Sequence, residues 1–264
     1  FYTRPQVFQY DAEWTLGAPA VLGTGAVYNC VSDAQGAIAC WGGLFDNNRS
    51  MRVTGMPQPA HFSLSSRFAC GVPANGSDVF CFEDGDGAAT TRRQSFGLPQ
   101  GTIAEYDALW LHECAIIAQG NTRKLYCWGA NFSDQIQLGG ESGYATAQEV
   151  SGVGTNVQTM AVGATANCAV TGEGDSERIK CWGYARTGST GVGLSNSNTM
   201  RTLALPNNAT WGRAQQLTLG FFGCALVEDP GPTRDREVWC WGTNDEGQLG
   251  IGETGDTPLP PTQA

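Results

Sequence analysis

The chain has 264 residues, 41% of them hydrophobic, with 36 glycines, 12 prolines and only 15% charged residues. This composition excludes a disordered tail and is typical of a folded domain in which many short β-strands are joined by tight turns. The formal net charge of −10, with lysine only at Lys124 and Lys180, disfavours binding to nucleic-acid phosphates or to an anionic membrane surface.

Ten cysteines indicate disulfide bonds and an oxidising compartment. The sequence has no Cys-x-x-Cys motif and no cysteines and histidines at zinc-binding spacing. It starts at Phe1 with neither an initiator methionine nor an apolar signal segment, as expected of a mature exported chain. No run reaches the roughly 18 apolar residues that cross a bilayer. We therefore expect a secreted or cell-surface protein without membrane insertion.

The cysteines form five successive pairs that mark a repeat. The second cysteine of a pair opens the phrase Cys-Trp-Gly in four repeats, and Cys81-Phe82-Glu83 takes its place in the second repeat. A rare tripeptide that recurs in register with an upstream cysteine predicts five copies of one supersecondary unit. The pairs are Cys30 and Cys40, Cys70 and Cys81, Cys114 and Cys127, Cys168 and Cys181, and Cys224 and Cys240.

The first repeat shows how each pair is expected to fold. Between Cys30 and Cys40, polar and glycine residues at positions 33–36 separate two apolar stretches, which predicts a β-hairpin with the cysteines opposite each other. Facing residues of a non-hydrogen-bonded antiparallel pair lie about 4.5 Å apart, within reach of a disulfide. Later repeats only lengthen the turn, as at residues 171–178. We predict one disulfide within each repeat.

The tryptophans of the repeated phrase are the expected contacts between repeats. Each short disulfide loop stabilises the fold by at most about 3 kcal/mol and holds only its own hairpin, so packing must join the repeats. A tryptophan beside a small glycine offers a large flat surface for a neighbouring sheet. The predicted packing residues are Trp41, Trp128, Trp182 and Trp241.

Four further tryptophans are candidate anchors for a sugar or a protein partner. Trp110 and Trp239 lie in strand-like runs near cysteines, so we expect them in the core. Trp14 and Trp211 have no such context, and their role stays open.

Catalytic, metal and cofactor sites are not expected. His61 and His112 lie in different repeats with no serine or carboxylate placed convincingly beside them, and the disulfides leave no free thiol. The acidic stretch Glu83–Gly87 lacks the downstream glutamate of a calcium loop, so we expect a solvated turn. The sequence therefore predicts a protein that is not an enzyme.

Four Asn-x-Ser/Thr sequons lie in predicted turns or loops between repeats, where a glycan could be accommodated. These candidate N-glycosylation sites, which apply if the source is eukaryotic, are Asn48, Asn75, Asn131 and Asn208.

The last repeat resembles that of the regulator of chromosome condensation (RCC1) family. Residues 240–252 read Cys-Trp-Gly-Thr-Asn-Asp-Glu-Gly-Gln-Leu-Gly-Ile-Gly, and the family hallmark is Trp-Gly, an asparagine two residues on, and Gly-Gln-Leu-Gly. Residues 161–170 and 218–226 resemble the other half of the repeat, and residues 127–139 and 181–193 are degraded copies. Only His112 matches the histidine that the family has two places before the first cysteine.

This resemblance implies an all-β fold, a β-propeller in which each of five blades is one four-stranded sheet. The whole chain, residues 1–264, would be one domain in which the N- and C-terminal segments share a blade. The family typically has seven blades, and the second repeat lacks Trp-Gly. The alternative is an open arc of five repeats that a neighbouring chain completes.

Two functions fit these observations. The first is a non-catalytic extracellular propeller whose loops bind a protein or a glycan, because loop length varies on a constant framework. The alternative is a structural subunit of a surface layer, appendage or extracellular filament, in which copies of the chain bind each other. Guanine-nucleotide exchange at chromatin, the best-known activity of the family, is disfavoured by the disulfides, the acidic charge and the lack of a basic tail.

Overall fold

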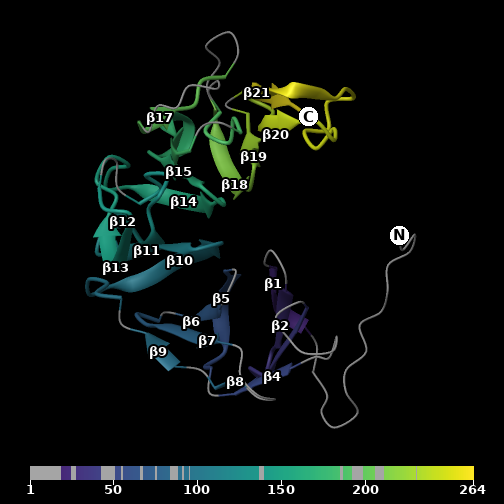
Figure 1. Ribbon diagram of the computed structural model, residues 1–264. Helices are drawn as coiled ribbons and strands as arrows, with labels where there is room; N and C mark the ends of the chain where they lie inside the picture. Colours follow the sequence, from purple (N-terminus) through teal and green to yellow (C-terminus); the bar gives the residue numbers. More distant parts are fainter. Residues whose placement is uncertain are drawn as a thin grey trace. The chain divides into compact units, whose positions relative to one another are not determined.

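In the computed structural model, the described part of the chain is built from β-strands, with one short 3-10 turn, η2 (Gly174–Ser176) (Figure 1). The structure describes residues 19–24, 28–42, 51–54, 56–65, 68–74, 76–83, 89–90, 92–94, 96–136, 140–184, 187–191, 199–205, 211–229 and 231–264. In these ranges, no helix has the length and apolar character needed to span a membrane.

The chain divides into two compact units, and the described strands form two sheets in the first. Unit 1 comprises Phe1–Ala74 and Asp78–Gln94. Its sheets have the strand orders β1-β2-β3-β4-β8 and β5-β6-β7-β9. The strands are β1 (Pro19–Thr24), β2 (Tyr28–Asp33), β3 (Ile38–Gly42), β4 (Met51–Thr54), β5 (Pro59–Leu64), β6 (Phe68–Pro73), β7 (Val79–Glu83), β8 (Ala89–Thr90) and β9 (Arg92–Gln94).

Unit 2 comprises Asn75–Ser77 and Ser95–Ala264 and holds three four-stranded antiparallel sheets, each built from consecutive strands. The first sheet contains β10 (Thr102–Leu109), β11 (His112–Gln119), β12 (Thr122–Ala130) and β13 (Gly143–Glu149). The second contains β14 (Val157–Val162), β15 (Ala166–Thr171), β16 (Arg178–Gly183) and β17 (Arg201–Thr202). The third contains β18 (Arg213–Leu219), β19 (Phe222–Glu228), β20 (Arg236–Asn244) and β21 (Gly255–Gln263).

The paired cysteines face each other across the second and third strands of every sheet, as the hairpins of the sequence predict. Each pair stands directly opposite in register with its Cα atoms 4.1 Å apart, and the sulfur atoms are bonded. The prediction of one disulfide within each repeat is therefore confirmed.

A β-bulge recurs in the first strand of every sheet. In each case one extra residue interrupts the pairing with the second strand, which increases the local twist. The interruptions lie between Pro19 and Val21, Pro59 and His61, Ile103 and Glu105, Val157 and Thr159, and Ala214 and Gln216. The bulge is thus a feature of the repeat that the sequence pattern did not reveal.

The glycine after each repeated tryptophan has a local role that differs from the predicted one. Gly129, Gly183 and Gly242 have φ values of 98°, 100° and 107°, in the region that favours glycine. A Cβ atom on Gly183 would lie 2.5 Å from the carbonyl oxygen of Thr165, in the turn before β15 of the same sheet. The glycine therefore lets the third strand pass close to this turn, and it is not there to admit a neighbouring sheet.

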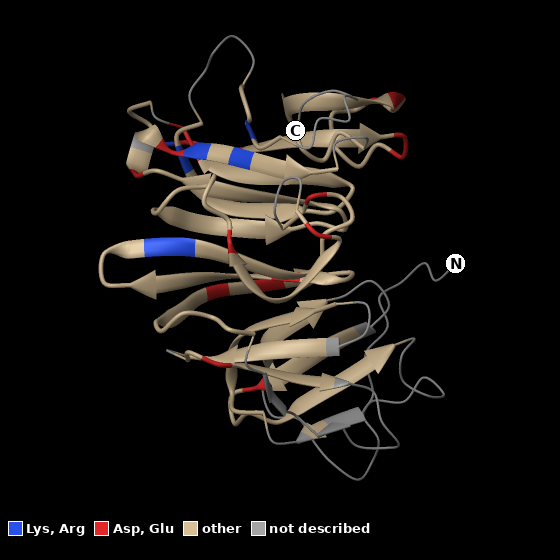
Figure 2. Ribbon diagram, turned by 60° about the vertical axis from the view of Figure 1, so that its left-hand side comes forward, with Lys and Arg blue, Asp and Glu red and all other residues tan. Residues whose placement is uncertain are grey.

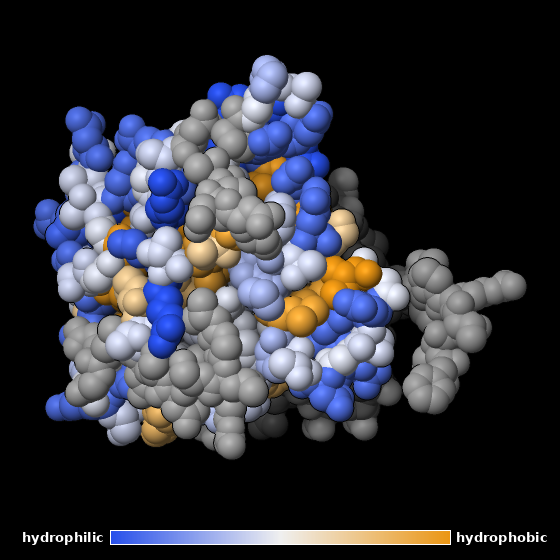
Figure 3. All heavy atoms as spheres, turned by 90° about the horizontal axis from the view of Figure 1, so that it is seen from above, coloured by the Kyte–Doolittle hydropathy of each residue, from blue (hydrophilic) through white to orange (hydrophobic). Residues whose placement is uncertain are grey.

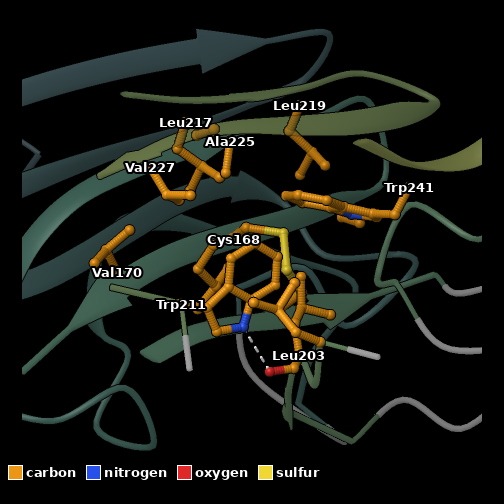
Figure 4. Packing of buried hydrophobic residues seen from close by; sticks show 14 residues of the cluster. Cys168, Val170, Leu203, Trp211, Leu217, Leu219, Ala225, Val227 and Trp241 are labelled. Atoms are coloured by element: carbon orange, nitrogen blue, oxygen red, sulfur yellow. Dashed lines mark hydrogen bonds between the residues drawn. A yellow bond between two sulfur atoms is a disulfide. The ribbon is translucent and has the colours of Figure 1, made fainter. Parts of the chain in front are cut away.

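Hydrophobic clusters join neighbouring sheets within each unit. In unit 2, Val170 and Ile179 of the second sheet pack with Ala225, Val227 and Trp241 of the third (Figure 4). A second cluster joins the first and second sheets, and a third joins the two sheets of unit 1. Because each sheet buries one face on the next, the sheets of a unit stack in chain order.

The described strands do not include a sheet that the two ends of the chain share. Residues 19–24 form β1, which pairs with β2, and the last sheet obtains its four strands from residues 213–263. The shared blade was predicted from residues 1–28, and residues 1–18 lie outside the described part of the chain.

Candidate interaction site

The repeated tryptophans connect neighbouring sheets in unit 2. Trp182 is 1% exposed, packs with Ile116 and Leu125 of the preceding sheet, and its indole Nε1 donates a hydrogen bond to the Gln135 carbonyl oxygen at 2.8 Å. Trp241 is fully buried and donates in the same way to the carbonyl oxygen of Ser189 in the preceding repeat, also at 2.8 Å. The tryptophan thus joins its own sheet to a loop of the repeat before it.

The other two tryptophans of the phrase have different surroundings. Trp128 is buried, and its ring stacks on Phe96 with the centroids 4.7 Å apart. Trp41, in unit 1, is only partly buried.

Buried polar side chains complete the contact between the first two sheets of unit 2. Asn167 is 1% exposed; its Oδ1 accepts a hydrogen bond from His112 Nε2 at 2.8 Å, and its Nδ2 donates to the Gln135 carbonyl oxygen at 2.7 Å. Burial lowers the pKa of His112 to about 4, so the ring is neutral at pH 7. Its partner is an amide, so His112 is positioned as a structural residue and not as a catalytic base.

The first strands of the same two sheets, β10 and β14, are also joined by hydrogen bonds to two carboxylates on β10. Thr159 Oγ1 donates to Glu105 Oε1 at 2.9 Å, and the Val162 amide donates to Asp107 Oδ2 at 2.8 Å. Burial raises the pKa of Glu105 to about 7, although the hydrogen bond from Thr159 acts in the opposite direction. These contacts hold strand β10 against strand β14.

A polar cleft of about 460 Å³ opens beside these contacts in unit 2. The guanidinium of Arg123 donates hydrogen bonds to the carbonyl oxygens of Val157 and Gln158. Arg213 pairs with Glu228 through its backbone, but its exposed guanidinium has no hydrogen-bond or ion-pair partner among the described residues. The buried Glu177 accepts from the Ala214 amide. The full lining is Arg123, Asn156, Gln158, Glu173, Gly174, Glu177 and Arg213.

The chemistry of this cleft is suited to binding. Its side chains offer two guanidinium groups, two carboxylates and two amides, so charges of both signs face a ligand. None of the lining residues is a serine, cysteine or histidine, and none is aromatic.

The structure changes the interpretation of two single tryptophans. Trp110 was expected in the core but is 45% exposed, because it occupies the two-residue turn between β10 and β11. Trp211 is 3% exposed, and its Nε1 donates to the carbonyl oxygen of Leu203 at 2.9 Å (Figure 4). Trp239 is partly buried against the same cluster, and Trp14 lies outside the described residues.

The sequon at Asn131 has a structural role in the folded chain. Asn131 is 3% exposed, its Nδ2 donates to the Glu141 carbonyl oxygen, and its Oδ1 accepts from the Ile136 amide. A glycan on Nδ2 would need space that this buried side chain does not have in the folded chain. Asn48, Asn75 and Asn208 lie outside the described residues, as do positions 84–87 of the acidic stretch. His61 lies on β5, and burial lowers its pKa.

These features define the class of protein. The first three strands of each sheet are consecutive and antiparallel, and a disulfide joins the second and third of them. In unit 2 a tryptophan contacts the preceding repeat. This is the construction of a β-propeller repeat protein, in which each sheet is one blade.

Comparison with known proteins specifies the family. Residues 235–263 match the model of the regulator of chromosome condensation (RCC1) repeat. The ultraviolet-B receptor UVR8 of Arabidopsis thaliana is 30% identical over 135 residues, which are 50% of this chain and 28% of UVR8. These matches support an RCC1-like repeat family for this chain.

Solved structures agree on the fold. Prp20p of Saccharomyces cerevisiae superposes with a TM-score of 0.73 and 13% identity over 93% of this chain and 65% of Prp20p. Human WBSCR16 gives a TM-score of 0.72 and 18% identity over 93% of this chain and 66% of that protein. At these identities the likeness concerns the fold alone, and this chain spans less than two thirds of each of these proteins.

Proposed function

We propose that this chain is a non-catalytic propeller that works in an oxidising compartment, secreted or at the cell surface, and binds a protein through the loops at the ends of its blades. The five disulfides support this compartment, because structural disulfides are rare in a reducing cytosol. Protein binding by a structural neighbour supports the proposed binding role, because Prp20p has been studied for its binding to Gsp1p and histones and in a structure bound to Kap60.

The observation that carries the proposal is a constant framework with divergent loops. Asn131 and Asn244 follow the Trp-Gly phrase at the same place in two repeats, and each bridges its loop by one accepted and one donated backbone hydrogen bond. The loops that they hold differ in chemistry, with Phe132 exposed in one and Asp245 exposed in the other. Different side chains on the same scaffold are typical of a recognition surface.

The polar cleft supports a polypeptide as the bound partner. The Arg213 guanidinium, which has no partner among the residues that the structure describes, can bind a carboxylate or a carbonyl group of a partner, and bidentate contacts of arginine are among the stronger hydrogen bonds in proteins. The cleft has no aromatic lining residue, so a glycan is the weaker candidate.

The second candidate function is a structural subunit of an assembly, which must be distinguished from a binding module. In unit 2, the outer edge strand β21 contains Pro258, Pro260 and Pro261, which have no N–H group to donate to an added strand. Polymerisation through this edge is thus disfavoured. Analytical ultracentrifugation at high concentration tests the alternative, which requires oligomers, whereas a binding module is expected to sediment as a monomer.

The proposal is tested by cross-linking with a carboxylate-reactive reagent, since the chain has only two lysines. The disulfide-intact protein is mixed with the proteins secreted by the same source, and cross-linked peptides are identified by mass spectrometry. We expect a partner cross-linked to the blade-end loops with micromolar or tighter affinity, and Arg213→Glu to weaken binding at the cleft more than the control Arg236→Glu. Absence of any such partner contradicts the proposal.

A further inference from the structure

An exposed tryptophan lies where the backbone favours glycine. Trp110 has φ 59° in the two-residue turn between β10 and β11, and its side chain is 45% exposed. A bulky residue in this left-handed region destabilises the fold by about 1–2 kcal/mol. The side chain of Trp110 is therefore exposed, and its backbone conformation lowers the stability of the fold.

Two more apolar side chains are exposed at the same end of this sheet. Leu111, the second turn residue, is 44% exposed, and Phe132 in the loop after β12 is 74% exposed. The turn and the loop adjoin, because the Ala130 amide donates to the Leu111 carbonyl oxygen at 2.8 Å. We call Trp110, Leu111 and Phe132 the Trp110 patch.

The loop that carries Phe132 is held in place before any partner binds. The buried Asn131 fixes it through the Ile136 amide at 2.7 Å and the Glu141 carbonyl oxygen at 2.8 Å, and Ile136 is itself 1% exposed. Aromatic anchors on a preorganised loop lose little conformational entropy on binding, so they contribute strongly to affinity.

The charged residues described at this end of the unit 2 sheets are acidic, and Arg186 in the loop after β16 lies outside the described residues. The described end segments are residues 110–111, 131–136, 140–142, 163–165, 187–191, 220–221 and 245–254, and none of them contains lysine or arginine. Basic residues such as Arg123, Arg178 and Arg213 lie instead at the starts of strands. In Figure 2, several blue Lys and Arg positions lie on strands, whereas red Asp and Glu positions mark several turns. The acidic residues of the end segments are Asp134, Glu141, Asp245, Glu246 and Glu253.

We propose that the Trp110 patch, with the carboxylates around it, binds a protein segment in which apolar side chains alternate with lysine or arginine. This inference rests on the proposed protein-binding function and names the partner chemistry. The apolar side chains would cover the patch, and the cations would face Glu141 and contact the aromatic rings. A second copy of the chain would present the same acidic end, and nucleic acid would present phosphates, so repulsion disfavours both.

Exposed apolar side chains elsewhere provide the control. In the space-filling view, hydrophobic residues reach the surface in small groups among hydrophilic ones (Figure 3), and Val238 on β20 is 42% exposed outside the end segments. Val238→Ser removes an exposed apolar side chain without changing the Trp110 patch.

The experiment measures fluorescence anisotropy of labelled 15-residue peptides with the disulfide-intact full chain. One peptide alternates lysine with leucine and tryptophan, a second replaces its lysines by glutamate, and a third alternates lysine with serine. We expect micromolar binding of the first, at least tenfold weaker binding of the others, and weaker binding at high salt. Trp110→Gly with Phe132→Ser should weaken binding at least tenfold, and Val238→Ser should leave it unchanged.

The substitution Trp110→Gly separates a loss of binding from a loss of folding. Glycine relieves the strained φ at position 110, so the variant should unfold at the same or a higher urea concentration than the wild-type chain. Equal binding by the double variant, equal binding of the acidic peptide, or no binding of any peptide overturns the inference. A dimer that the double variant abolishes also overturns it and identifies a second copy as the occupant. A cross-linked partner found without any peptide binding leaves the proposed function standing and this inference refuted.

Discussion

The contact between the first two sheets of unit 2 gives a quantitative prediction for Asn167→Ala. The variant loses the hydrogen bonds from His112 and to the Gln135 carbonyl oxygen. That carbonyl keeps its bond from Trp182, but the His112 ring stays buried with Nδ1 already without a partner among the described residues. Two neutral hydrogen bonds contribute about 1 kcal/mol each, and a buried donor left unpaired adds about 1–3 kcal/mol.

The free energy of unfolding should therefore fall by about 3 kcal/mol, a large part of the 5–15 kcal/mol of a typical domain. The assay is equilibrium unfolding in urea at pH 7 without reductant, followed by tryptophan fluorescence. Asn156→Ala is the matched control, because its side-chain bonds to Glu173 and Gln158 lie near the surface, and its expected effect is below about 1 kcal/mol.

A double-mutant cycle of His112→Ala with Asn167→Ala should give a coupling energy of at least about 1 kcal/mol, since the two side chains are in contact. The reasoning is refuted if Asn167→Ala destabilises no more than Asn156→Ala does, or if the effects of the two substitutions in the cycle are additive.

Two further predictions concern the same unit. Gly183→Ala places a Cβ atom 2.5 Å from the Thr165 carbonyl oxygen at φ 100°, so we expect it to lower the free energy of unfolding by at least about 2 kcal/mol. Gly120→Ala, at φ 57° with open space around it, should lower it by only about 1 kcal/mol, and equal effects in urea unfolding would contradict the steric argument. Burial raises the pKa of Glu105 from 4.5 to about 7, so the folded chain holds a proton that the unfolded chain releases, and stability falls as the pH rises through this window. Glu105→Gln keeps an oxygen for Thr159 and should leave stability at pH 4 unchanged but raise it at pH 8 by at most about 3 kcal/mol; the same difference at both pH values would show that the charge is not responsible.

Features that depend on local sequence were predicted correctly. The cysteines of a pair are 10 to 16 residues apart, and a hairpin with turn residues at its middle brings them opposite each other whatever the rest of the chain does. The Trp-Gly phrase recurs with them, so the number of repeats and the all-β class also followed from the sequence.

The position of single side chains depended on residues far away in the chain. Trp110 near Cys114 has the pattern of a strand, but the register of β10 with β11 makes it a turn residue. The sequence left the role of Trp211 open, and the structure buries it with Leu203, Leu217 and Trp241 in one cluster.

The sequence by itself thus determined the repeated unit, because alternation, turn residues and cysteine spacing act over a few residues. Only the tertiary structure decided which side chains lie between sheets and which face solvent. The cleft at Arg213 and the Trp110 patch arise from segments that are separated in sequence and are brought together by strand register and sheet stacking. That information is absent from any local pattern.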